Sequence, residues 1–327
     1  MWRVGTSPGR TASSWLIAWA ASVALLFFLE PRWPHWLLRP EPFEALIDRT
    51  GAVQQRFSGG EPSQPKFLRD GKPRFGYVGE FSEGLAVATD APREDYWSDS
   101  TLFGYIDESG EYVIPPRFNW ASPFSEGWAA VCRGACRNTL DGKDTIQFID
   151  RKGKVVLSPG LTVVSNFSGG LAAAKLGAGV RAAFGYLDRT GKFAIYPRFS
   201  VARDFSEGLA VTDSGYINRK GDVVIRRVAA RDGGDFSEGL AVVVTKEGRK
   251  QYIDKTGAVV LDPGYEELGP FSEGLAPACK SDCGPSTSSA HWGYIDRTGK
   301  FQIEPRFSGM PGRFRNGLAR VCVHCTS

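Results

Sequence analysis

Histidine is scarce in this sequence, and runs of like charge are absent from it. The three histidines (His35, His291 and His324) are too few and too scattered for a histidine-based metal or catalytic centre. The formal net charge of +4 over 327 residues is mild, whereas a nucleic-acid binder concentrates Lys and Arg on one face. We therefore expect no nucleic-acid partner.

Several motifs of common enzyme classes are also missing. The sequence contains no P-loop, no H-E-x-x-H motif, no Rossmann fingerprint and no calcium loop of the D-x-D-x-D-G type. We predict no catalytic residue, no cofactor and no metal site, and we expect that the protein is not an enzyme.

One segment, residues 12–29, has the composition of a membrane-spanning helix. It contains no charge over 18 positions, which is close to the shortest length that spans a hydrocarbon core of about 30 Å. No long stretch outside it shows helical periodicity. An uncleaved signal anchor and a cleaved secretory signal peptide are both open interpretations, and a buried helix of a soluble protein is a third.

The residues that flank this segment favour the signal anchor. The run ends in Phe27, Phe28 and Leu29, which are bulky where a signal peptidase needs small residues, and Trp33 and Trp36 suit a membrane interface. We expect a cytoplasmic tail (1–11), the signal anchor or signal peptide (12–29), a linker (30–44) and a repeat domain (45–327). The repeat domain would lie outside the cytoplasm, periplasmic or extracellular, and signal cleavage would make it a secreted protein.

The six cysteines form three close pairs: Cys132/Cys136, Cys279/Cys283 and Cys322/Cys325. Each pair begins three residues after a recurrent motif, and an even count at equivalent positions favours local disulfides in an oxidising compartment. Zinc binding and redox chemistry are the rival interpretations. They are less favoured because the pairs stand on different repeats and Cys322 follows a strand pattern.

The sequence repeats itself seven times. The six residues FSEGLA stand at 81–86, 205–210, 236–241 and 271–276, with near-copies at 124–129, 167–172 and 314–319. They alternate with seven D-x-x-G phrases, at 45–53, 104–114, 147–157, 185–195, 215–225, 251–261 and 293–303. Such self-similarity is the signature of a repeat architecture.

Each D-x-x-G phrase predicts a β-hairpin. Asp at the first turn position accepts a hydrogen bond from the N–H two residues on, and Gly at the fourth tolerates a positive φ. The flanks are β-branched and aromatic, as in strands, and a third short strand follows Ser-Glu-Gly. We predict an all-β fold of seven repeats of about 30–45 residues, each a short antiparallel β-meander, besides the one N-terminal transmembrane helix.

Two features favour a propeller-like ring over an open curved β-solenoid. Seven is a common number of blades. The array also begins with a hairpin that lacks a preceding motif strand and ends with a motif strand that lacks a following hairpin. These two halves can pair and so remove two exposed edges. The irregular spacing of the motifs, which falls to 31 residues, argues for the open array.

This pattern resembles the bacterial WG-repeat family, whose units carry a Trp-Gly-Tyr-Ile-Asp phrase and an F-x-E-G-L-A phrase. The closest match is HWGYID at 291–296, with Trp292 and Gly293, while other repeats have Phe103-Gly104 or Phe184-Gly185 instead. The resemblance covers roughly residues 45–327. It implies a β-repeat domain without a defined reaction.

The recurrent glutamates of the motif support two hypotheses: Glu83, Glu126, Glu207, Glu238 and Glu273. They could form a calcium-binding ring or a glycosidase pair, which needs two carboxyls about 5–9.5 Å apart. Alternatively, each is a turn residue whose carboxylate caps backbone N–H groups ahead of the Gly. Gly169 and Asn316 replace two of the seven copies, which favours the structural role.

A contact surface is predicted from other residues. Segments that occur only once mark the binding face of many repeat arrays, and here they are 54–74, 90–102, 133–145 and 280–291. The Arg of each Pro-Arg-Phe phrase could line one rim, or lie over a neighbouring ring. The predicted contact patch consists of Tyr96, Trp97, Arg117, Arg198 and Arg306.

The sequence thus favours a non-enzymatic, membrane-tethered, extracytoplasmic protein that binds or scaffolds a protein or a cell-envelope glycan. The alternative is a glycan-cleaving enzyme on a propeller-like ring. That alternative requires a close pair of non-repeated acids in a central or rim pocket.

Overall fold

The structure is a computed structural model that describes residues 43–58, 68–69, 72–92, 95, 98–134, 146–161, 163–176, 183–226, 233–281, 283 and 291–323. These residues belong to the compact unit Pro42–Ser327. Their regular structure is β-strand without an α-helix, so the all-β prediction is confirmed. None of these ranges holds a helix that could cross a membrane. The predicted transmembrane helix, residues 12–29, lies outside the described residues.

The described strands form seven antiparallel sheets of three or four strands and one two-stranded sheet. Sheet 1 contains β2 (Val53–Ser58), β1 (Phe43–Asp48) and β26 (Leu318–Val323). Sheet 2 contains β5 (Tyr77–Val78), β6 (Ala86–Thr89), β7 (Phe103–Ile106) and β8 (Tyr112–Phe118). Sheet 3 contains β9 (Trp120–Ala121), β10 (Trp128–Cys132), β11 (Gln147–Asp150) and β12 (Val155–Leu157). Sheet 4 contains β13 (Ala172–Leu176), β14 (Ala183–Leu187) and β15 (Phe193–Phe199).

The remaining sheets repeat the same order. Sheet 5 contains β16 (Leu209–Thr212), β17 (Gly215–Asn218) and β18 (Val223–Ile225). Sheet 6 contains β19 (Ala241–Val244), β20 (Lys250–Ile253) and β21 (Val259–Leu261). Sheet 7 contains β22 (Glu267–Leu268), β23 (Ala276–Cys279), β24 (Trp292–Ile295) and β25 (Phe301–Phe307). A small extra hairpin, β3 (Leu68–Arg69) with β4 (Lys72–Pro73), stands in the chain between sheets 1 and 2.

The D-x-x-G phrases form the predicted hairpins. In sheet 4 the Oδ1 atom of Asp188 accepts a hydrogen bond from the N–H of Thr190 at 2.8 Å, and the N–H of Gly191 reaches the Asp188 carbonyl at 3.0 Å. Gly191 has a φ of 82°, a conformation that glycine adopts without a Cβ clash. The same pattern recurs at Asp48, Asp107, Asp150, Asp254 and Asp296, and with Asn in place of Asp at Asn218.

The sheets gain an inner strand that the sequence pattern did not predict. Just before each motif the chain pairs with the strand that follows the motif. In sheets 2, 3 and 7 this pairing makes a two-residue strand, β5, β9 or β22. In sheets 4, 5 and 6 it is reduced to single bridges, Val164↔Ala174, Ala202↔Thr212 and Gly233↔Val243. The predicted three-stranded meander is therefore extended inward by a short fourth segment.

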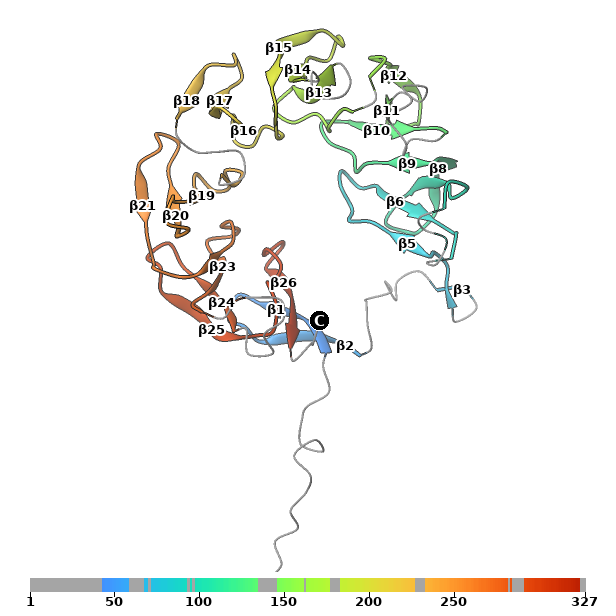
Figure 1. The fold of residues 1–327 in the computed structure, drawn as a ribbon. Coiled ribbons are helices and arrows are strands. Elements are labelled where there is room, and N and C mark those ends of the chain that lie inside the picture. The colour runs from blue at the N-terminus through green and yellow to red at the C-terminus, as the bar shows by residue number, and fades with distance from the viewer. Residues whose placement is uncertain are drawn as a thin grey trace, which may run out of the picture. The chain divides into compact units, whose positions relative to one another are not determined.

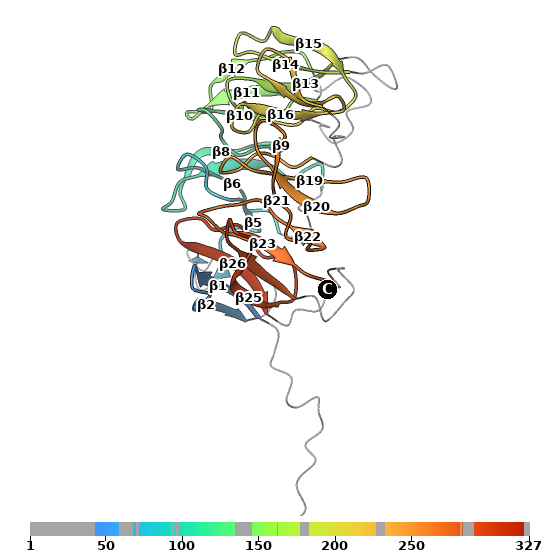
Figure 2. The ribbon, with the colours of Figure 1, turned by 90° about the vertical axis from the view of Figure 1, so that its left-hand side faces the viewer.

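The two ends of the array pair with each other. β1 and β26 lie antiparallel over six residue pairs, from Phe43↔Val323 to Asp48↔Leu318. Sheet 1 is thus assembled from both ends of the repeat domain, as predicted. Figure 1 shows the seven sheets following one another around a ring, and Figure 2 shows β1, β2 and β26 side by side in one sheet.

Buried aromatic pairs link successive sheets. The Tyr of one sheet's third strand packs against the Phe that opens the next motif, as in Tyr105–Phe124, with ring centroids 4.8 Å apart. The Tyr hydroxyl also donates to a carbonyl of the next sheet's inner segment: Tyr105 to Ser122, Tyr186 to Arg203, Tyr216 to Gly234, Tyr252 to Gly269 and Tyr294 to Gly312. These aromatic side chains are buried, so the motif Phe fills the space between two sheets at Phe124, Phe205, Phe236, Phe271 and Phe314. Phe81 of the first motif is only half-buried.

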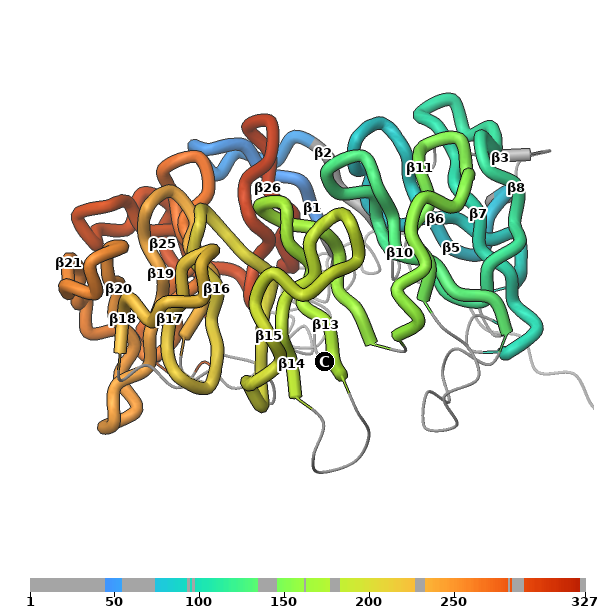
Figure 3. Tube along the Cα trace, turned by 90° about the horizontal axis from the view of Figure 1, so that it is seen from above, coloured from blue at the N-terminus to red at the C-terminus, as the bar shows by residue number. Residues whose placement is uncertain are grey.

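The antiparallel order of the strands separates two faces of the ring. The motif turns and the D-x-x-G hairpins lie on one face, which we call the hairpin face. The connections between the second and third strands of the sheets leave from the other, the loop face (Figure 3). Three of the segments that occur only once, 90–102, 133–145 and 280–291, are connections of this second kind. The strand ends from which these three segments leave therefore lie on the loop face.

Candidate functional site

The motif glutamates form a ring of caps on the hairpin face. Each has a positive φ, between 50° and 55°, and its carboxylate accepts the backbone N–H of the Gly in the next copy of the motif. The bonds are Glu83 to Gly127, Glu126 to Gly170, Glu207 to Gly239, Glu238 to Gly274 and Glu273 to Gly317. The structural hypothesis is thus supported with one correction, since the Gly that is capped belongs to the next sheet.

Other side chains complete the same bridges. The hydroxyl of Ser82 donates to the Phe124 carbonyl at 2.7 Å, and every later motif Ser makes the equivalent bond: Ser125, Ser168, Ser206, Ser237 and Ser272. A cation of the neighbouring hairpin then reaches the motif Glu, as Arg297 does at Glu238 and Lys255 at Glu207. These repeated polar groups are engaged in holding sheets together.

The two exceptions to Glu keep the backbone conformation. Gly169 has a φ of 63° and Asn316 a φ of 52°, and glycine and asparagine tolerate the left-handed region best. In the last copy Arg315 stands in place of Ser and forms an ion pair with Glu80 of sheet 2. The turn geometry is therefore retained in every copy, while the carboxylate is not.

The predicted contact-patch arginines lie at three separate sheet junctions. Each donates from Nη2 to the Gly carbonyl of the next hairpin: Arg117 to Gly153 at 2.7 Å, Arg198 to Gly221 at 2.6 Å and Arg306 to Gly51 at 2.5 Å. Each guanidinium also lies about 5 Å from the ring of the following Phe. The structure does not gather these arginines into one patch, and Tyr96 and Trp97 lie outside the described residues.

A disulfide anchors one of the loop-face connections. Cys279 and Cys283 are joined, with Cα atoms 6.0 Å apart, as predicted. Cys132 and Cys322 each take part in a disulfide as well. The partners predicted for them, Cys136 for Cys132 and Cys325 for Cys322, lie outside the described residues. Within the described ranges no group of three or more His, Cys, Asp or Glu side chains is placed to hold a metal ion.

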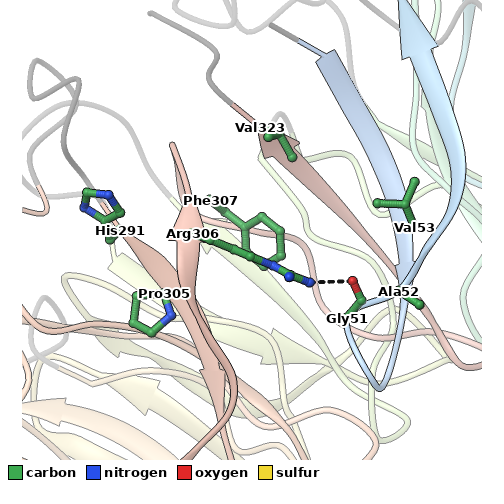
Figure 4. Close-up of a pocket in the computed structure, with 8 residues that line it drawn as sticks. All are labelled: Gly51, Ala52, Val53, His291, Pro305, Arg306, Phe307 and Val323. Carbon is green, nitrogen blue, oxygen red and sulfur yellow. Dashed lines mark hydrogen bonds between the residues drawn. The ribbon is translucent and has the colours of Figure 1, made fainter. Parts of the chain in front are cut away.

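A cavity of about 610 Å³ opens at the junction between sheets 7 and 1. Its walls are the hairpin Gly51–Val53, the strand end Pro305–Phe307, and the side chains of His291 and Val323 (Figure 4). Arg306 was predicted as a contact residue, whereas His291 and Val323 were missed. The sequence does contain a signal for Val323. Arg133 and Lys280 stand at the same position after their motifs, so Val323 is an apolar residue where two other repeats have a cation.

Two acids stand on neighbouring inner segments, each directly before a motif Phe. Loss of hydration raises the pKa of the Asp204 carboxyl, the hydroxyl of Ser165 lowers it, and the negative charge of Asp235 raises it further, although both aspartates are exposed at the surface. Asp204 and Asp235 are not part of the repeated cap network. Both stand at the same repeat position, directly before a motif Phe, whereas the enzyme alternative requires a pair of non-repeated acids.

The fold and the cap network define a class: a ring of repeated small β-sheets whose recurring motif residues bridge successive sheets. The model of the family described as "WG containing repeat" matches the chain at five places: residues 103–135, 148–178, 184–212, 252–282 and 292–324. The chain belongs to the WG-repeat family. No curated protein matches it.

Solved structures with a similar arrangement share little sequence with this chain. BamB from Moraxella catarrhalis is 12% identical, with a TM-score of 0.42, over 85% of this chain and 91% of that chain. Apo AztD from Citrobacter koseri is 13% identical, with a TM-score of 0.37, over 83% of this chain and 77% of that chain. A protein of unknown function from Bacteroides caccae is 13% identical, with a TM-score of 0.30, over 80% of this chain and 93% of that chain.

Proposed function

We propose that this WG-repeat protein is a non-enzymatic, membrane-tethered module of the cell envelope, with a propeller-like ring outside the cytoplasm. In this proposal its loop face binds a protein or a cell-envelope glycan. The proposal rests mainly on one observation: the repeated side chains are used to hold the sheets together, and three of the segments that occur only once start from the opposite face. The repeated Glu, Ser, Arg and Tyr side chains bridge successive sheets, whereas three of the segments that occur only once leave from strand ends on the loop face.

The disulfides support the same assignment. Disulfides persist in oxidising compartments and are rare in the cytosol. Cys279–Cys283 ties the start of the connection 280–291 to the end of β23. Such a tie limits the conformations that the connection can adopt, which lowers the entropy cost of binding a partner.

The loop-face assignment is tested by photo-crosslinking from two positions of the same sheet in the full-length protein. Leu102, at the loop-face end of β7, has 41% of its side chain exposed, and Glu108 is exposed on the hairpin beyond the other end of β7. A photoreactive residue at 102 should capture a defined partner that one at 108 does not. Equal capture from both positions, or capture only from 108, would contradict the proposal.

The proposed location has its own test. Fractionation should place the full-length chain in the membrane, and a thiol reagent should label the purified protein only after reduction. Free cysteines in the exported protein, or a chain found only in the cytosol, would contradict the proposed location.

The glycan-cleaving alternative is favoured by one observation, the coupled pair Asp204 and Asp235. A carboxyl with a raised pKa near a second carboxyl is the pattern of a general acid in sugar-cleaving enzymes. If the alternative holds, Asp204→Asn should abolish cleavage of an envelope polysaccharide without loss of folding. If the parent cleaves no polysaccharide, or if Asp204→Asn cleaves it as fast as the parent, the glycan-cleaving alternative is wrong and the binding module is retained.

A further inference from the structure

The cavity at the junction of sheets 7 and 1 combines an apolar floor with one guanidinium. Phe307 is buried to all but 2% of its surface and forms the floor, while Val53 is 42% exposed on the facing hairpin. Arg306 projects between the two sheets toward Gly51 (Figure 4). Small-molecule sites commonly have this composition, in a volume of about 300–1,000 Å³.

The equivalent place at the junction of sheets 2 and 3 is covered by an arginine. There Phe118, Arg117 and Gly153 take the parts of Phe307, Arg306 and Gly51. The guanidinium of Arg133 lies 5.5 Å from the centroid of the Phe118 ring. Val323 holds the repeat position of Arg133, five residues after the start of the motif's last strand. Phe118 and Phe307 are equally buried, each with 2% of its surface exposed. The two junctions therefore differ in the long cationic side chain that Val323 lacks, and the cavity lies at the junction without it.

The charge in the cavity is not neutralised by the described residues. The interactions found for Arg306 in the described structure are the bond to the Gly51 carbonyl and the contact with the Phe307 ring. By contrast, Arg74, the equivalent residue before sheet 2, forms an ion pair with Glu111 at 2.8 Å. A guanidinium carries five N–H donors in a fork that matches a carboxylate. Arg306 therefore has donors left for a ligand, and the exposed imidazole of His291 stands on the same wall.

We propose that this cavity binds the carboxylate of an apolar organic acid. The carboxylate would bond to Arg306, and the apolar body would lie between Val53 and Val323. The same chemistry is offered by a free aromatic or aliphatic acid and by the C-terminal carboxylate of a peptide that ends in an apolar residue. This site is separate from the loop face, so the two proposals can fail independently.

The test uses the full-length protein purified in detergent and titration calorimetry with three probes: 3-phenylpropionate, 3-phenylpropionamide and N-acetyl-phenylalanine. The acid should bind at least tenfold more tightly than its neutral amide, because only the acid pairs with the guanidinium. If N-acetyl-phenylalanine binds more tightly than 3-phenylpropionate, the ligand is the C-terminus of a peptide. If 3-phenylpropionate binds more tightly, the ligand is a free acid.

Matched variants separate binding from folding. Val323→Arg restores the side chain found at position 133 and should abolish binding without lowering the unfolding temperature. Arg306→Met should weaken binding of the acid at least tenfold. Arg198→Met removes the same intersheet bond at another junction, so it should lower stability similarly and leave the affinity unchanged.

Three results would overturn the proposal. They are equal binding of the acid and the amide, full binding by Val323→Arg, and an equal loss of affinity in Arg198→Met and Arg306→Met. Absence of binding of all three probes at millimolar concentration would overturn it as well.

Discussion

At the residue scale, the motif glutamate combines an unfavourable backbone with a favourable side-chain bond. A non-glycine residue in the left-handed region costs roughly 1–2 kcal/mol. Hydrogen bonds to charged groups contribute about 1.5–3 kcal/mol. Glu238 makes such a bond to Gly274 and an ion pair with Arg297 at 3.1 Å, with 30% of its side chain exposed. The cap therefore outweighs the strain, which explains why Glu can occupy a position otherwise suited to Gly or Asn.

Replacing Glu238 should separate these two effects. Glu238→Ala loses the cap and keeps the strain, so we expect the free energy of unfolding to fall by about 1–2 kcal/mol. Glu238→Gly loses the cap and relieves the strain, so its loss should be smaller by about 1 kcal/mol. Urea denaturation followed by tryptophan fluorescence measures both. The cap role would be wrong if Glu238→Ala were as stable as the parent.

Asp204 makes stability depend on pH in a defined direction. Its pKa is raised in the folded protein, so the folded state binds more protons than the unfolded state between the ordinary carboxyl pKa of about 4 and the raised value. Stability should therefore fall as pH rises through that window. Asp204→Asn should be more stable than the parent at neutral pH, and the difference should vanish below about pH 4. An unchanged difference from pH 3 to 8, in thermal unfolding, would refute this.

At the element scale, the hairpins could be predicted because their determinants are local. Asp at the first turn position and Gly at the fourth decide the turn within five residues, and Asn218 serves as well as Asp. The inner strands β5, β9 and β22 could not be predicted. Their residues, Tyr77–Val78, Trp120–Ala121 and Glu267–Leu268, share no recurring type, because backbone pairing with the next strand forms them.

Tyrosine hydroxyls connect one element to the next, and Tyr252 is a suitable test. Its side chain is fully buried and its hydroxyl donates to the Gly269 carbonyl at 2.7 Å. Tyr252→Phe leaves that carbonyl without its partner, which should lower the free energy of unfolding by about 1–3 kcal/mol. Tyr196→Phe is the control, because 72% of Tyr196 is exposed and its substitution should be neutral. Equal losses in the two variants would contradict the role assigned to the buried hydroxyl.

The disulfide Cys279–Cys283 closes a short loop at the end of β23. A loop of this size should contribute about 2 kcal/mol through the entropy of the unfolded chain. In chemical denaturation, the free energy of unfolding of the double variant Cys279→Ser/Cys283→Ser should be lower by about that amount. Its amide hydrogens should exchange faster only in sheet 7. Loss of protection throughout the ring would show that the bond is needed for more than its own connection.

At the scale of the whole molecule, the junction between sheets 1 and 2 differs from the others. Leu46 stands at the repeat position of Tyr105, Arg315 at that of the motif Ser, and Asn316 at that of the motif Glu. The described bridge there is the ion pair between Arg315 and Glu80, two largely exposed side chains. Exposed ion pairs contribute only about 0–1 kcal/mol. The pairing of β1 with β26 over six residue pairs joins the two ends of the array.

The ring closure could be anticipated from the two incomplete end repeats, whereas the cavity could not. Incomplete halves leave unpaired strand edges, and pairing them is the simplest way to satisfy their backbone groups. The cavity is lined by a hairpin of sheet 1, the end of β25, and the side chains of His291 and Val323, and only the folded ring brings these parts together. A repeat alignment reveals that Val323 replaces a cation, but it does not reveal the cavity.

The pairing of β1 with β26 is tested most directly by a cross-strand disulfide. Leu46 and Arg320 are direct partners in the ladder, and such partners have Cα atoms about 4.5–5.5 Å apart, within reach of a disulfide. In Leu46→Cys/Arg320→Cys, proteolysis and mass spectrometry should find the two peptides linked within a monomer. In the control Leu46→Cys/Leu318→Cys, displaced by two residues, the link should be rare. No excess of the 46–320 link over the control, or links only between chains, would contradict the closed ring.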